Sequence, residues 1–104
     1  MYYQPKSDLL NNRIILVTGA SDGIGREAAL SYARYGAQVV LLGRNAEKLQ
    51  RVCDEVNAHS QVPALWFTLD LETATAESCR ALAETLATQV PRLDGVLHNA
   101  GLLG

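Results

Sequence analysis

Three glycines, Gly19, Gly23 and Gly25, follow directly after the apolar run Ile14-Ile15-Leu16-Val17. Glycines placed there allow a tight turn, close approach of the backbone to a ligand and close packing of the next helix on the strand. The free N–H groups at the start of that helix carry partial positive charge, which favours a pyrophosphate. Simple turn chemistry is the alternative. We expect an anion-binding turn formed by Gly19, Ser21, Asp22, Gly23, Ile24 and Gly25.

The spacing of these glycines is informative in itself. It differs from the G-x-G-x-x-G pattern of the commonest dinucleotide-binding turn. No Lys-Ser or Lys-Thr pair follows the glycines, so a P-loop is not expected.

A second group with chemical potential is Gly43-Arg44, which follows the apolar run Val39-Val40-Leu41-Leu42. In a strand–helix–strand unit, the end of the second strand reaches the adenosine ribose of a dinucleotide. An acidic residue there would bind the ribose hydroxyls and repel a 2′-phosphate, whereas Gly43 leaves that space empty and Arg44 offers a charged fork. The pair therefore predicts NADP(H) over NAD(H), with a solvated loop arginine as the alternative.

Alternating strands and helices must position these residues. Unbroken apolar runs predict buried parallel strands over about 14–17 and 39–42, and two further strands are expected over about 64–69 and 96–98. Helical spacing predicts a first helix over about 24–35 that Gly36 ends, a second that Asn45 caps, and a third that Thr73 or Thr75 caps. The fold predicted is α/β, a Rossmann-like doubly wound parallel sheet in strand order 3-2-1-4. We expect one domain over residues 1–104, with an arm over about 1–12.

Each predicted helix has an apolar face that we expect to lie on the sheet. These faces are Ile24, Ala28, Ala29, Tyr32, Ala33 and Tyr35 on the first helix, Leu49, Val52, Cys53 and Val56 on the second, and Cys79, Leu82, Ala83, Leu86 and Val90 on the third. The charged residues of the second helix, Glu55 among them, are expected to form a solvated face.

The composition excludes several classes of function. The 104 residues are 48% hydrophobic and carry a formal net charge of −2, which gives no basic surface for nucleic acid. No stretch approaches the roughly 18 apolar residues of a membrane span, and the N-terminus lacks the pattern of a signal peptide, so we expect no membrane and a cytoplasmic location. Cys53 and Cys79 form no C-x-x-C or Cys/His cluster, which predicts reduced, partly buried thiols and no metal site.

Two motifs together point to a family. Thr18-Gly19-Ala20-Ser21-Asp22-Gly23-Ile24-Gly25 resembles the T-G-x-x-x-G-I-G cofactor motif of the short-chain dehydrogenase/reductase family. His98-Asn99-Ala100-Gly101 is similar to that family's N-N-A-G, with His98 in place of the first Asn. The resemblance covers nearly the whole chain but only the first half of a typical member.

The resemblance implies roles for further residues. Asp70 would contact the adenine amino group, and Leu71 would pack at the adenine ring. Ala100 and Gly101 would let the cofactor ribose pass close by, and Asn99 would tie strand four to strand one near Thr18. His98 is expected to be a hydrogen-bonded core residue. Asp22 stands where many NADP-using relatives carry Arg or Lys, which weakens the preference for NADP without reversing it.

Members of this family transfer hydride between a nicotinamide and a carbonyl or alcohol. They use a Tyr-x-x-x-Lys pair with a Ser and usually an Asn, all downstream of N-N-A-G. None of these residues follows Gly101 here, so general acid catalysis has no proton donor and we expect the chain alone to be inactive. The small-molecule substrate would bind to the half of the fold that is absent.

Two functional hypotheses remain. The favoured one is the cofactor-binding part of an NADP-dependent short-chain oxidoreductase. The alternative is a non-catalytic nucleotide-binding or interaction domain complete at 104 residues. Strand 96–98 would be an open sheet edge without a blocking proline or lysine, so we expect copies to associate there as a homo-oligomer.

Overall fold

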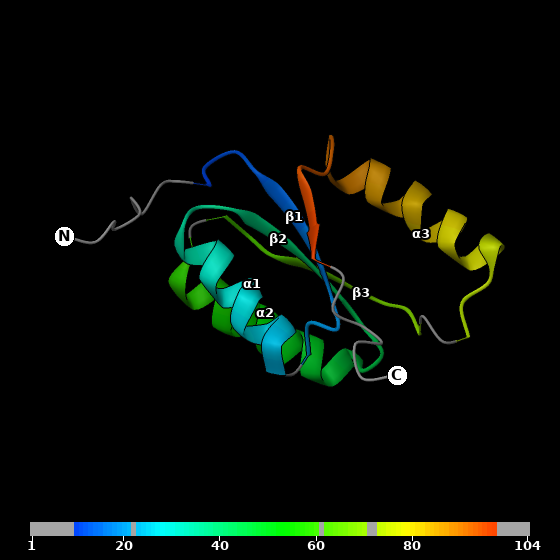
Figure 1. Ribbon diagram of the computed structural model, residues 1–104, viewed down its shortest axis with the longest axis horizontal. Helices are drawn as coiled ribbons and strands as arrows, with labels where there is room; N and C mark the ends of the chain where they lie inside the picture. Colours follow the sequence, from blue (N-terminus) through cyan, green and yellow to red (C-terminus); the bar gives the residue numbers. More distant parts are fainter. Residues whose placement is uncertain (1–9, 22, 61, 71–72, 98–104) are drawn as a thin grey trace.

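The computed structural model describes residues 10–21, 23–60, 62–70 and 73–97. Four parallel strands form one sheet in the order β3-β2-β1-β4, which confirms the predicted fold class and strand order (Figure 1). The strands are β1 (Ile14–Thr18), β2 (Gln38–Gly43), β3 (Leu65–Thr68) and β4 (Gly95–Leu97). The helices are α1 (Gly23–Arg34), α2 (Ala46–His59) and α3 (Ala76–Gln89).

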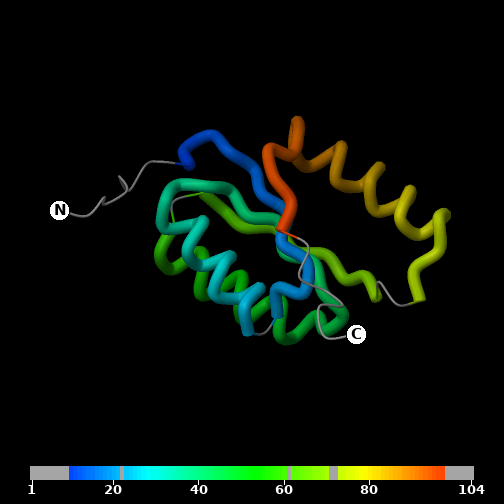
Figure 2. The backbone as a smooth tube through the Cα atoms, in the orientation of Figure 1, coloured from blue at the N-terminus to red at the C-terminus, as the bar shows by residue number. Residues whose placement is uncertain are grey.

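Helices cover both faces of the sheet. The chain runs from β1 through α1, β2 and α2 to β3, and then α3 brings it back to β4, beside β1 (Figure 2). Alternate residues of each strand point to opposite faces. Val17, Val39 and Leu41 pack with α1 and α2, whereas Ile14 and Val40 pack with α3. Near-continuous burial of β2 follows, and it explains why that strand is an unbroken apolar run.

The helix ends follow the predicted local chemistry. The side chain of Asn45 accepts a hydrogen bond from the Lys48 N–H at 3.1 Å and so caps α2. Of the two candidate caps for α3, the structure uses Thr75, which forms a capping box with Ser78. Gly36 follows α1 with φ 98°, a left-handed conformation that favours glycine.

The predicted inward face of α1 is partly wrong. Ile24 is 68% exposed, and the buried residues of α1 are Gly25, Ala29, Leu30 and Ala33. A stripe that begins at Gly25 rather than Ile24 is rotated by about 100° around the helix. The small residues Gly25 and Ala29 are buried in this stripe, and α1 packs against β1. Tyr32 and Tyr35 are half-buried.

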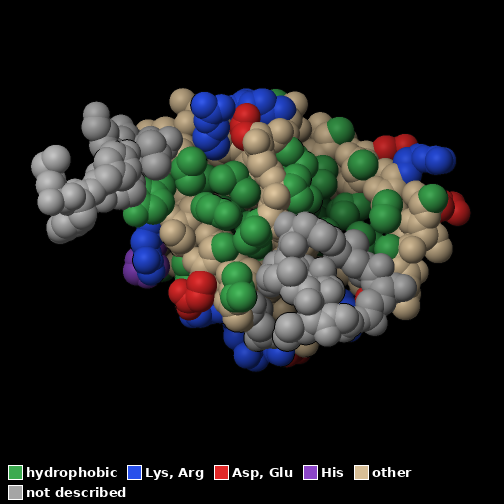
Figure 3. All heavy atoms as spheres, in the orientation of Figure 1, with side chains coloured by type: hydrophobic (Ala, Val, Ile, Leu, Met, Phe, Trp, Pro, Cys, Tyr) green, Lys and Arg blue, Asp and Glu red, His purple; other side chains and the backbone are tan. Residues whose placement is uncertain are grey.

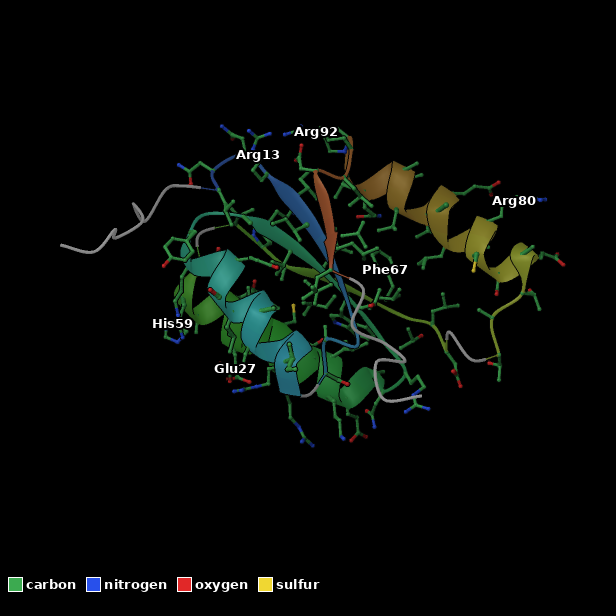
Figure 4. All side chains as sticks on the ribbon, in the orientation of Figure 1. Arg13, Glu27, His59, Phe67, Arg80 and Arg92 are labelled. Carbon is green, nitrogen blue, oxygen red and sulfur yellow. The ribbon has the colours of Figure 1, made fainter. Side chains whose placement is uncertain are left out.

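The predicted inward face of α3 is wrong over the first half of the helix. Leu86 and Val90 are buried and Leu82 is half-buried, but Cys79 and Ala83 are exposed. In Figure 1 the last turn of α3 lies beside the sheet, whereas its first turns lie away from it. Phe67 of β3 belongs to the cluster of Leu86 and Val90 and lies on the α3 side in Figure 4. Of the two thiols, Cys53 is buried and Cys79 is exposed, so only Cys53 fits the predicted burial.

A charged cluster joins β1 to β4 at the amino end of the sheet. The Asp94 carboxylate accepts hydrogen bonds from the Ile14 N–H at 2.8 Å and from Arg92 Nε at 3.0 Å. Arg13 lies 3.8 Å away, and Figure 4 places Arg13 and Arg92 at the same edge of the molecule. The hydrogen bond from Ile14 and the two arginines hold the pKa of Asp94 below its usual value, although partial burial opposes them. This cluster fixes the β1–β4 pairing at the end opposite to the candidate site.

Hydrophobic side chains gather over the sheet between α1 and α3 on the face shown in Figure 3. On β4, Val96 is 58% exposed. Within the ranges that the structure describes, no helix is long and apolar enough to cross a bilayer.

Candidate cofactor-binding site

The strand ends bring the predicted site residues to one edge of the sheet. Thr18 pairs with Leu42, and Gly43 pairs with Thr68, so β1, β2 and β3 end at the same level. Gly19, Arg44 and Asp70 follow these ends. In open parallel sheets, ligands bind in the crevice outside the carboxyl ends of the strands. This edge is therefore the candidate site.

The glycine turn has the backbone that its sequence predicts. Gly19 and Gly23 have φ values of 62° and 58°, and residues that carry a side chain rarely adopt such positive values. A Cβ at Gly23 would meet nothing within 4 Å, so the backbone angle rather than space requires glycine there. Gly25 is buried in α1 against the sheet. The Ala20 N–H donates to the Leu42 carbonyl at 3.2 Å and ties the turn to β2.

The side chains around this turn are unequally placed. Ser21 is half-buried and Ile24 is exposed, so both are accessible to a ligand at the start of α1. Asp22 lies outside the described residues. The N-terminus of α1 carries partial positive charge, and none of the residues in its first turn is acidic. The arrangement fits an anion.

Thr18 joins β1 to β4 at the site. It is 4% exposed, and its hydroxyl donates to the Leu97 carbonyl at 3.3 Å. The sequence predicted that Asn99 would link these two strands, and Asn99 lies outside the described residues. Thr18 is not among the predicted site residues, although it opens the T-G-x-x-x-G-I-G motif, and that position was the available signal.

Gly43 and Arg44 differ sharply in environment. Gly43 is buried, and a Cβ there would lie 3.2 Å from Cδ2 of Leu49, which is fully buried. Arg44 is exposed, and within the described ranges the structure records no carboxylate paired with it. Its guanidinium is therefore available to an anion beside the end of β2.

Asp70 follows β3 and is half-buried. Its carbonyl accepts from the Thr73 N–H at 3.2 Å and from the Thr73 hydroxyl at 3.4 Å, which makes a turn before α3. This geometry is compatible with both the turn role and the predicted adenine contact. Leu71, His98, Asn99, Ala100 and Gly101 lie outside the described residues, so their predicted roles stay predictions.

An ion pair next to the glycine turn was not foreseen. Arg26, which directly follows Gly25, donates from Nε to Glu55 Oε1 at 3.0 Å and from Nη2 to Glu55 Oε2. Its Nη1 donates to Glu27 at 2.9 Å. The hydrogen bonds to Glu55 raise the pKa of the Arg26 guanidinium. Glu55 was expected on the solvated face of α2, and helical spacing within α2 alone gives no signal of a partner on α1.

Over the described part of the chain, no three His, Cys, Asp or Glu residues come together as metal ligands. One Tyr-x-x-x-Lys spacing does occur in the sequence, from Tyr2 to Lys6. That pair precedes β1 rather than following Gly101, includes Pro5, and lies outside the described residues.

Comparisons with known proteins agree with this geometry. Residues 13–104 match the short chain dehydrogenase family. The chain is 66% identical over 104 residues to the uncharacterized oxidoreductase YciK of Escherichia coli K12, covering 100% of this chain and 41% of that protein. The chain therefore spans less than half the length of this relative.

Solved structures give the same result. A short chain dehydrogenase of Shigella flexneri 2a, complexed with NADP, is similar with a TM-score of 0.91 and 65% identity, over 95% of this chain and 41% of that one. One of Escherichia coli CFT073, complexed with NADPH, gives 0.92 and 66%, over 96% and 42%. From its glycine turn, its sheet order and these matches, we conclude that the chain belongs to the short-chain dehydrogenase family.

Proposed function

We propose that the protein binds NADP(H) across the carboxyl end of its sheet and is the cofactor-binding part of a short-chain oxidoreductase. The observation that carries this proposal is the exposed Arg44 directly after the buried Gly43 at the end of β2. A dinucleotide places its adenosine ribose there, and a guanidinium fork suits a 2′-phosphate. Two relatives about two-thirds identical to this chain were solved with NADP and NADPH, which supports the choice.

Each proposed contact has its own element. The turn before α1 holds the pyrophosphate, Arg44 holds the 2′-phosphate, and the end of β3 holds the adenine. The turn residues are Gly19, Ser21, Asp22, Gly23, Ile24 and Gly25; Asp70 and Leu71 adjoin the adenine; and Asn99, Ala100 and Gly101 adjoin the nicotinamide ribose.

The proposed reaction moves a hydride between C4 of the nicotinamide and a carbonyl or alcohol carbon. Reduction leaves an oxyanion that must take a proton from an acid. In this proposal, the residues named above bind and orient the cofactor. The substrate is a small carbonyl or alcohol compound that other residues must recognise. Association of copies through the β4 edge, where Val96 is exposed, is part of the same proposal.

Isothermal titration calorimetry with NADPH and NADH tests the cofactor assignment. We expect NADPH to bind at least about tenfold more tightly, because a charge-assisted hydrogen bond to the 2′-phosphate contributes about 1.5–3 kcal/mol. Equal affinity for the two cofactors contradicts the role of Arg44. Binding of neither contradicts the proposed function as a whole.

A further inference from the structure

The ion pair of Arg26 and Glu55 joins two helices that begin at opposite parts of the proposed site. Arg26 lies in the first half of α1, which starts at the glycine turn, and Glu55 lies on α2, which starts just after Arg44. The guanidinium engages both carboxylate oxygens of Glu55, with Nε at 3.0 Å from Oε1 and Nη2 on Oε2. A two-point contact of this kind fixes orientation as well as separation.

Arg26 does not itself bind a phosphate in this arrangement. Its third nitrogen, Nη1, donates to Glu27 at 2.9 Å, so two carboxylates surround the guanidinium. In contrast, Arg44 has no recorded carboxylate partner within the described ranges. The two arginines near the site therefore have different tasks, one facing protein and one facing ligand.

The pair contributes little to overall stability. The side chains of Arg26 and Glu55 are 35% and 41% exposed, and ion pairs at such exposure typically contribute little to the free energy of unfolding. The effect of the pair on position is different, because the first turn of α1 has few large side chains to hold it. In that turn, Gly23 and Gly25 have no side chain to pack, and Ile24 is exposed.

We propose that Arg26 is a positioning residue whose bridge to Glu55 fixes the glycine turn relative to Arg44. This inference rests on the proposed function. A cofactor that spans both subsites binds tightly only when their spacing matches its own, whereas a fragment that occupies one subsite is indifferent to the spacing. Loss of the bridge should therefore weaken binding of the whole cofactor more than binding of the fragment.

Calorimetric titration of two ligands against a set of variants tests this. The ligands are NADPH, which spans both subsites, and adenosine 2′-monophosphate, which has the 2′-phosphate but no pyrophosphate. The variants are Arg26→Gln, Glu55→Gln and the double variant. The control is Arg34→Gln, which removes the same charge from an exposed position of α1 for which the described structure records no ion pair.

We expect Arg26→Gln and Glu55→Gln each to lower the affinity for NADPH about three- to fivefold, with the affinity for the nucleoside monophosphate unchanged within about twofold. The double variant should lose no more than either single variant, because the same bridge is removed once. Arg34→Gln should bind both ligands like the unsubstituted protein.

Three outcomes overturn the inference while leaving the proposed function intact. In the first, Arg26→Gln binds NADPH as tightly as the unsubstituted protein. In the second, both ligands weaken by the same factor, which indicates general unfolding or a loss of net charge. In the third, Arg34→Gln matches Arg26→Gln. If the unsubstituted protein binds neither ligand, the proposed function itself fails.

Discussion

Replacement of Arg44 by alanine is the most direct test of the cofactor site. Arg44 is exposed, and the described structure records no ion pair for it, so its removal leaves no buried partner unsatisfied. The substitution should therefore lower the affinity for the ligand without lowering the stability of the protein. A charge-assisted hydrogen bond contributes about 1.5–3 kcal/mol, which corresponds to about tenfold to a hundredfold in NADP(H) affinity.

The measurement is calorimetric titration of Arg44→Ala with NADPH and with NADH at low ionic strength. NADH, which has no 2′-phosphate, serves as an internal control and should bind almost as it does to the unsubstituted protein. Added salt should reduce the difference in NADPH affinity between Arg44→Ala and the unsubstituted protein, because exposed charges are screened. The matched control is Arg51→Ala, another exposed arginine, in this case on α2 and away from the end of β2.

Two results would refute the reasoning. Equal losses of affinity for NADPH and NADH in Arg44→Ala would show that Arg44 does not recognise the 2′-phosphate. An equal loss in Arg51→Ala would show that the effect comes from total charge rather than from position. Thermal denaturation of both variants should differ little from that of the unsubstituted protein, since substitutions at exposed sites change stability by about 0.5 kcal/mol or less.

Three further predictions concern stability and are measured by urea denaturation. Thr75→Ala should lower the unfolding free energy by about 1 kcal/mol because it removes the capping box of α3, whereas Thr73→Ala should cost less. Gly36→Ala should cost about 1–2 kcal/mol because φ is 98° there, whereas Gly95→Ala, whose Cβ would lie 3.8 Å from Ile15, should be nearly neutral. Asp94→Asn should destabilise at pH 7. The pKa of Asp94 is lowered in the folded protein, so its contribution to the free energy of unfolding is present above the unfolded pKa of about 3.9 and is lost as pH falls through the folded value. If Asp94→Asn remained less stable than the unsubstituted protein at low pH, this reasoning would be contradicted.

Most of the fold could be predicted because its signals are local. Strand β2 is an unbroken apolar run because both of its faces are covered, and Asn45 and Gly36 mark helix ends by their own chemistry. The inward face of α1 could not be predicted in the same way. Its rotation depends on how closely Gly25 and Ala29 approach the sheet, which is a property of two packed elements rather than of one helix.

In the candidate site too, only the features with a local sequence signal could be predicted. The glycine turn and Arg44 could be located from sequence because each stands directly at a strand end. The partner of Arg26 could not, because Glu55 is 29 residues away and looks like one charge among several on a polar helix face. The exposure of Cys79 also depends on where α3 leaves the sheet, and no pattern within α3 records that.

Cofactor preference and core packing meet at Gly43. A side chain at this position would begin 3.2 Å from Cδ2 of Leu49, a fully buried residue of α2. An acidic residue at this position would therefore require Leu49 to shift by a few tenths of an ångström, as well as adding a charge. The space beside Gly43, expected from the sequence to be empty, is thus filled by Leu49, and the proposed preference for the 2′-phosphate rests on Arg44.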